Sequence, residues 1–190
     1  MTTQQLEQKT TWNIDPAHSR AEFTVKHMMI TKVRGRFSDL EGVITVDESA
    51  PENSGVEVTI DAASINTQQE DRDQHLRSGD FLDVENHPEL TFRSTRVEGL
   101  SLEEGSSFTV IGDLTIRGTT KQVELDATFE GRGQDPWGNQ RAAFSADTAV
   151  DRRDFGLEWN QALETGGVLV GHEVEIHLEA QAVLESDDEE

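Results

Sequence analysis

Two histidines and a dense group of acidic residues between positions 71 and 88 are the first candidates for metal chemistry. The stretch reads DRDQHLRSGDFLDVENHP, with His75 and His87 among its carboxylates. Imidazole and carboxylate groups ligate zinc, but zinc sites usually take two ligands from a tight local pair. His75 and His87 are far apart in the chain, and no His-x-x-x-His pattern occurs in it. We therefore expect ordinary surface groups here and no metal site.

Nucleophilic and phosphate-binding motifs are also missing from the sequence. Ser38, Ser64, Ser78 and Ser145 lack the glycines of a nucleophile elbow, and there is no glycine-rich phosphate loop. The chain contains no cysteine, which excludes thiol catalysis. We therefore predict no catalytic residue and no cofactor.

The segment KHMMITKVRGRF, residues 26–37, is the one basic and apolar stretch of an acidic chain. It is either a local counter-charge for the acidic helix expected at 70–85 or the mouth of a passage for an apolar ligand. As a mouth, the flexible pair Met28–Met29 would adapt to the ligand, and His27 and Arg34 would hold its polar head. The competing interpretation has His27 buried and bonded to backbone, and Arg34 paired with an acid such as Asp39.

Alternation of apolar and acidic residues predicts the strands that must position these groups. Near the C-terminus, Val174, Ile176 and Leu178 alternate with Glu173, Glu175 and His177. Similar segments recur along the chain with turn residues between them, so we expect about eight antiparallel strands joined by hairpins. Small residues at inward positions suit either a barrel with a cavity or two closely packed sheets. These positions are Ala21, Gly112, Ala127, Ala142, Ala146, Ala180 and Ala182.

The composition bounds the class of protein. The 190 residues suit one domain, and a net charge of −22 excludes nucleic acid as a partner because like charges repel. No run approaches the ~20 apolar residues of a membrane span, so we expect a protein that is not membrane-embedded. No signal peptide is visible, which predicts a cytoplasmic location, or a periplasmic one if a leader was removed. The acidic, lysine-poor surface would also suit a salt-adapted source.

Short motifs in order along the chain resemble the YceI family. They are WNIDPAHS at 12–19, FTVKHM at 23–28, VRGRF at 33–37, HPELTF at 87–92, GDLTIRGTTK at 112–121 and DRRDFGL at 151–157. The resemblance covers residues 11–184 as one domain, and we expect 1–10 and 185–190 to be disordered flanks. It implies an all-β, extended, lipocalin-like antiparallel barrel around a long apolar tunnel, commonly as a homodimer and often periplasmic.

The resemblance also places the charged insert over the barrel as a short helical cap, broken near Gly79, with its two histidines incidental. It implies binding, storage or transport of a long-chain isoprenoid-type lipid, such as a polyprenyl or quinone tail. The alternative is an enzyme, a hydrolase or isomerase, acting on such a lipid. We assign the following residues to the tunnel: Phe23, Val25, Met28, Met29, Phe37, Ile44, Leu76, Phe81, Phe92, Leu114, Phe144, Phe155 and Trp159.

Overall fold

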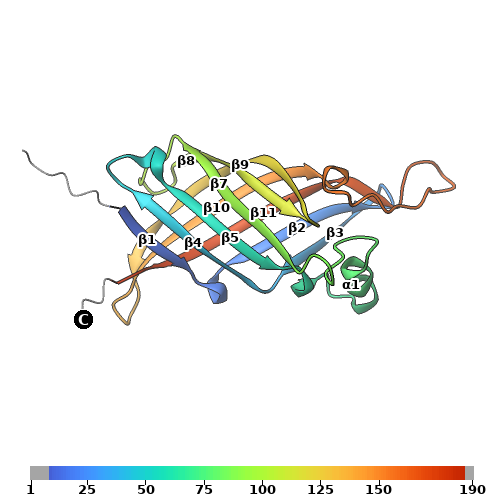
Figure 1. The fold of residues 1–190 in the computed structure, drawn as a ribbon, viewed down its shortest axis with the longest axis horizontal. Coiled ribbons are helices and arrows are strands. Elements are labelled where there is room, and N and C mark those ends of the chain that lie inside the picture. Colours follow the sequence, from blue (N-terminus) through green and yellow to red (C-terminus); the bar gives the residue numbers. More distant parts are fainter. Residues whose placement is uncertain (1–8, 187–190) are drawn as a thin grey trace, which may run out of the picture.

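The computed structural model describes residues 9–186, and these form strands, one short α-helix and a few 3-10 turns (Figure 1). The strands are β1 (Lys9–Ile14), β2 (Arg20–His27), β3 (Thr31–Phe37), β4 (Leu40–Asp47), β5 (Gly55–Asp61), β6 (Ile65–Asn66), β7 (Glu89–Glu98), β8 (Ser107–Ile116), β9 (Thr119–Gln134), β10 (Gln140–Asp151) and β11 (Val170–Leu184). The helix is α1 (Glu70–Arg77), and the 3-10 turns are η1 (Pro16–His18), η2 (Pro51–Asn53), η3 (Ala62–Ser64) and η4 (Arg152–Phe155).

The strands close into an antiparallel barrel because β1 pairs with both β4 and β11. The closed ring runs β1-β4-β5-β7-β8-β9-β10-β11, while β2, β3 and β6 continue the sheet from the other half of β11. The predicted barrel of about eight strands is therefore confirmed, and the two-sheet alternative is not adopted. Strand β1 begins at Lys9, inside the predicted disordered flank. Residues 1–8 and 187–190 lie outside the described range.

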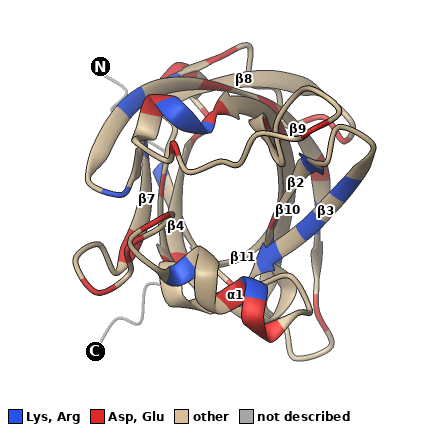
Figure 2. Ribbon diagram, turned by 90° about the vertical axis from the view of Figure 1, so that its right-hand side faces the viewer, with Lys and Arg blue, Asp and Glu red and all other residues tan. Residues whose placement is uncertain are grey.

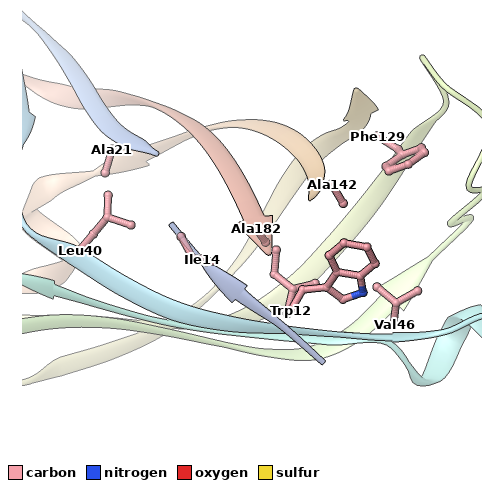
Figure 3. Close-up of a cluster of buried hydrophobic side chains, with 9 residues drawn as sticks. Trp12, Ile14, Ala21, Leu40, Val46, Phe129, Ala142 and Ala182 are labelled. Atoms are coloured by element: carbon pink, nitrogen blue, oxygen red, sulfur yellow. The ribbon is translucent and has the colours of Figure 1, made fainter. Parts of the chain in front are cut away.

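Packed apolar side chains close the barrel at the end that carries β1 (Figure 3). Trp12 and Ile14 from β1 belong to one buried cluster with Phe129 from β9 and Ala182 from β11. Ala182 has no exposed surface, and it lies opposite both Ile14 and Ala142 in the strand ladders. Small side chains at these inward positions let the strands converge, so this end is filled with protein.

Arg141 joins three segments at the same closed end. Its Nη1 donates to Asp15 Oδ2 at 2.8 Å and to Gln181 Oε1 at 3.1 Å, and its Nε donates to Asp135 Oδ2 at 2.8 Å. These partners belong to the β1–η1 corner, to β11 and to the β9–β10 loop. The Arg141 hydrogen bond lowers the pKa of Asp15 to about 2 and holds the pKa of Asp135 well below its usual value.

The charged insert forms α1, which lies beside the opening at the opposite end of the barrel (Figure 2). Gln69 caps the helix by accepting from the Arg72 backbone N–H at 2.7 Å. The helix ends at Arg77 because Ser78 is extended, so it stops before the predicted break at Gly79. Among residues 9–186, no helix has the length and apolar character required to cross a membrane.

Replacing Arg141 with methionine should destabilise the protein in a pH-dependent way. Because its partner carboxyls have depressed pKa values, they stabilise the fold above the ordinary carboxyl pKa of 3.8 and lose this effect as the pH falls through about 2. Urea unfolding of wild type and Arg141→Met should therefore differ most near neutral pH and converge in acid. Arg93→Met, which removes only an exposed pair with Glu57, is the control and should change stability by less than ~1 kcal/mol. If the difference in unfolding free energy between wild type and Arg141→Met stayed unchanged down to pH 2, it would contradict this account.

Candidate ligand-binding cavity

The barrel encloses an apolar cavity of about 700 Å³, within the ~300–1,000 Å³ range of small-molecule sites. The inward residues of β2 to β5 and of β7 to β11 form its wall, so segments far apart in sequence face one space. Apolar wall residues include Phe23, Val33, Phe37, Ile44, Val58, Phe92, Val110, Leu114, Leu125, Phe144, Ile176 and Leu178. An apolar space of this kind excludes water and accepts apolar ligands.

Phenylalanines form the floor of the cavity. The Phe144 ring lies 6.3 Å from that of Phe108 and 5.3 Å from that of Phe129, measured between centroids. Phe108 and Phe144 line the cavity, whereas Phe129 is only 2% exposed and belongs to the closed end. The boundary between packed core and open space therefore runs between Phe129 and Phe144.

Two glycines make room for aromatic rings on the wall. A Cβ atom at Gly35 would lie 2.3 Å from Phe23 Cζ, and one at Gly112 would lie 2.6 Å from Phe92 Cζ. Each glycine sits beside its phenylalanine on an adjacent strand, so the ring can lie flat over the missing side chain. The glycines thus keep the two rings on the wall and out of the middle of the cavity.

One face of α1 turns polar groups toward the open end. Gln69, Arg72, His75 and Leu76 follow helical spacing, and all of them line the cavity, as does Asp71. Arg72 is held by Thr67, whose hydroxyl and carbonyl accept at 2.7 and 2.9 Å. His75 packs edge-on against Phe81 and Trp159, with ring centroids 5.0 and 4.7 Å away. The predicted cap therefore contributes to the cavity, and His75 is not the incidental surface group that the sequence suggested.

Arg152 places a buried positive charge at the same end. It is 5% exposed, lines the cavity and has no carboxylate within 4 Å among the described residues. Its guanidinium instead donates to four backbone carbonyls, those of Leu157, Trp159, Val170 and Gly171. Burial lowers its pKa from the usual arginine value. Arg152 therefore holds the segment 157–171 in place and adds a cation to an otherwise apolar surface.

Most of the residues assigned to the tunnel from the sequence do line this cavity. They are Phe23, Val25, Phe37, Ile44, Leu76, Phe81, Phe92, Leu114, Phe144, Phe155 and Trp159. Met28 and Met29 do not line it, because they form the exposed turn between β2 and β3. Their assignment to the tunnel wall was wrong.

The two predicted headgroup residues lie on opposite faces of the sheet. His27 lines the cavity, whereas Arg34 is exposed and borders an open hollow on the outside of the barrel. The reason is the register of the hairpin, in which Arg34 pairs with the outward-facing Thr24. The structure therefore does not bring His27 and Arg34 together. Within the described residues, Arg34 also forms no ion pair with Asp39.

Sequence reasoning missed Arg72, His75 and Arg152 as cavity residues. The helical spacing of 69, 72 and 76 could have indicated the face of α1 that turns inward. The sequence does not single out Arg152, because the next residue, Arg153, is also an arginine. In the structure Arg153 points to solvent, where it pairs with Asp151. Among residues 9–186, no group of three or more histidine, aspartate or glutamate side chains could hold a metal ion.

A closed antiparallel barrel around an apolar cavity defines a ligand-enclosing barrel protein. The model of the YceI-like domain matches residues 12–182, and the chain belongs to this family. A UPF0312 protein of Pectobacterium carotovorum is 42% identical over 140 residues, which are 74% of this chain and 71% of the relative.

Solved structures share the fold at lower sequence identity. BcnA of Burkholderia cenocepacia superposes with a TM-score of 0.76 at 22% identity, covering 88% of this chain and 98% of that one. A polyisoprenoid-binding domain from Saccharophagus degradans superposes with a TM-score of 0.68 at 15% identity, covering 92% and 98%. At such identities the likeness shows a common fold.

Two phenylalanines at the floor should respond differently to truncation. Phe129→Ala leaves a new void in packed protein and should lower the free energy of unfolding by about 3–5 kcal/mol. Phe144→Ala removes a ring that already borders open space, so it should lower the free energy of unfolding clearly less. Urea unfolding of the ligand-free proteins measures both. Equal losses would mean that the barrel is filled at Phe144.

Arg152 and Arg153 are a matched pair for testing the buried charge. Arg152→Met leaves four carbonyls without their donor and should lower the free energy of unfolding by about 3 kcal/mol or more. It should also expose residues 157–171 to limited proteolysis. Arg153→Met removes an exposed pair and should cost less than ~1 kcal/mol. If residues 157–171 stayed resistant to proteolysis in Arg152→Met, other contacts would be holding this segment.

Proposed function

We propose that this protein binds a long-chain isoprenoid-type lipid in the barrel and stores or carries it. The observation that supports the proposal most directly is the apolar cavity of about 700 Å³, with a packed floor at Phe144 and the arginines Arg72 and Arg152 at the other end. A polyprenyl or quinone tail matches a deep, dry, aromatic-rich space of this shape. The similar fold of the polyisoprenoid-binding domain from Saccharophagus degradans agrees with this choice of ligand class.

The distribution of charge suggests how such a lipid would lie. Arg72, His75 and Arg152 line the end beside α1, together with the single carboxylate that α1 contributes, that of Asp71, whereas phenylalanines lie at the floor. We infer that the apolar tail enters first and that a phosphate, hydroxyl or carbonyl head stays near the two arginines, since charge-assisted hydrogen bonds are the stronger ones. His27 also lines the cavity and stays a candidate for the same head.

We infer binding and not catalysis as the role of the cavity. A hydrolase or isomerase would need a positioned acid, base or nucleophile at the reacting atoms of the lipid. Incubation with a polyprenyl ester or quinone, followed by mass spectrometry, should return the lipid unchanged. A converted product would favour the enzymatic alternative. The homodimer and the location expected from the sequence stay predictions.

A large side chain placed inside the cavity should weaken lipid binding. Ala146 lines the cavity on β10, and Ala149 on the same strand is exposed on the outer face. Ala146→Trp places an indole in the space that the lipid would occupy, so its affinity for a polyprenol should fall at least ~tenfold. Ala149→Trp should bind as the wild type does. Fluorescence titration with detergent-dispersed polyprenol measures both, and equal affinities would contradict binding inside the barrel.

A further inference from the structure

The exposed apolar side chains of the barrel are concentrated at one turn. Within residues 9–186, the large apolar side chains that are exposed are Met28, Met29, Ile30, Val43 and Trp137. Met28, Met29 and Ile30 are consecutive and are 44%, 57% and 81% exposed. They form the tip of the β2–β3 hairpin, here called the hairpin tip. A contiguous apolar tip on so acidic a protein indicates an interaction surface.

The backbone of the hairpin tip is unfavourable for the residues it carries. Met28 and Met29 have φ values of 53° and 64°, and the Ile30 N–H donates to the His27 carbonyl at 3.2 Å. Positive φ at both central residues is the mark of a turn that strongly prefers Asn-Gly. Two methionines in this position are therefore not explained by the stability of the turn.

The positive charges at the base of the hairpin tip are also unfavourable for the stability of the fold. Lys26 and Lys32 lie directly opposite each other on β2 and β3, and both are exposed. Like charges at opposed positions destabilise a strand pair. The chain has only four lysines and a net charge of −22, yet two of the four flank this tip. Among residues 9–186, the one acidic partner of these two lysines is Glu175, at 3.6 Å from Lys32 Nζ.

The hairpin tip adjoins the open end of the cavity. Lys26 and His27 line the cavity, and the Met28 N–H donates at 2.8 Å to the carbonyl of Leu169, another lining residue. In Figure 1, β2 and β3 reach the same end of the barrel as α1. A surface that held the hairpin tip would therefore also face the cavity's opening.

We propose that the hairpin tip docks the protein on a phospholipid bilayer so that its cavity opens toward the membrane. Met28, Met29 and Ile30 enter the boundary of the acyl chains, and Lys26 and Lys32 contact lipid phosphates. The acidic remainder of the surface stays away from the phosphates, which fixes the orientation. This inference rests on the proposed function, since it supplies the route by which a membrane lipid reaches the barrel.

Flotation with phosphatidylcholine vesicles tests the docking. The variant Met28→Asn/Met29→Gly/Ile30→Ser removes the apolar tip while giving the turn the residues that it prefers, so it should fold at least as well as the wild type. Its partition to vesicles should be about tenfold lower than that of the wild type. Lys26→Glu should also weaken partition, although it creates an opposite-charge pair with Lys32. Trp137→Ser is the matched control and should bind as the wild type does, because this 82% exposed side chain lies in the β9–β10 loop at the closed end.

Equal partition of wild type and triple variant, or no vesicle binding by the wild type, overturns the docking proposal. A triple variant with a changed oligomeric state in analytical ultracentrifugation also overturns it, because a second copy would then cover the hairpin tip. Uptake of detergent-dispersed polyprenol is measured in parallel and should be the same for wild type and triple variant. Uptake without vesicle binding would defeat the docking alone, whereas failure of the wild type to take up polyprenol would defeat the proposed function.

Discussion

The pairing of β1 with both β4 and β11 is the interaction on which the rest of the structure depends. It closes the sheet and brings Trp12 and Ile14 into one buried cluster with Phe129 and Ala182, so that one end of the barrel is packed protein. The seal leaves a cavity with an apolar lining along the rest of the barrel, and apolar cavities hold water poorly. The wall glycines at 35 and 112 widen that interior by letting phenylalanine rings lie flat against the strands.

Polar contacts hold the segments at the open end. There, two arginines are held by backbone and hydroxyl partners. Arg152 donates to four carbonyls, and Arg72 donates to Thr67. Such contacts hold α1 and the segment 157–171 in place without filling the opening with apolar packing. The result is a cavity with an apolar floor and cationic groups near its entrance, which gives a long amphipathic molecule a direction in which to lie.

Alternation predicted the strands and much of the wall, because side chains alternate along a strand and one face of each strand is apolar. It left a barrel and two packed sheets open, and the resemblance to the YceI family implied the barrel. The sequence could not predict which residues meet across a turn. His27 and Arg34 were grouped by closeness in sequence, but the register set by the hairpin turn puts Arg34 on the outer face. Arg152 and Arg153 could not be told apart either, since only the geometry of η4 decides which of them turns inward.

The central claim is that the barrel holds an isoprenoid-type lipid, and native mass spectrometry of the protein isolated from its own host tests it most directly. The account predicts a bound mass that is released on unfolding and that fragments as a chain of isoprene units. It also predicts that stripped protein regains one equivalent of an added polyprenol. A protein that carries no lipid from its host and takes up none after stripping would contradict the account.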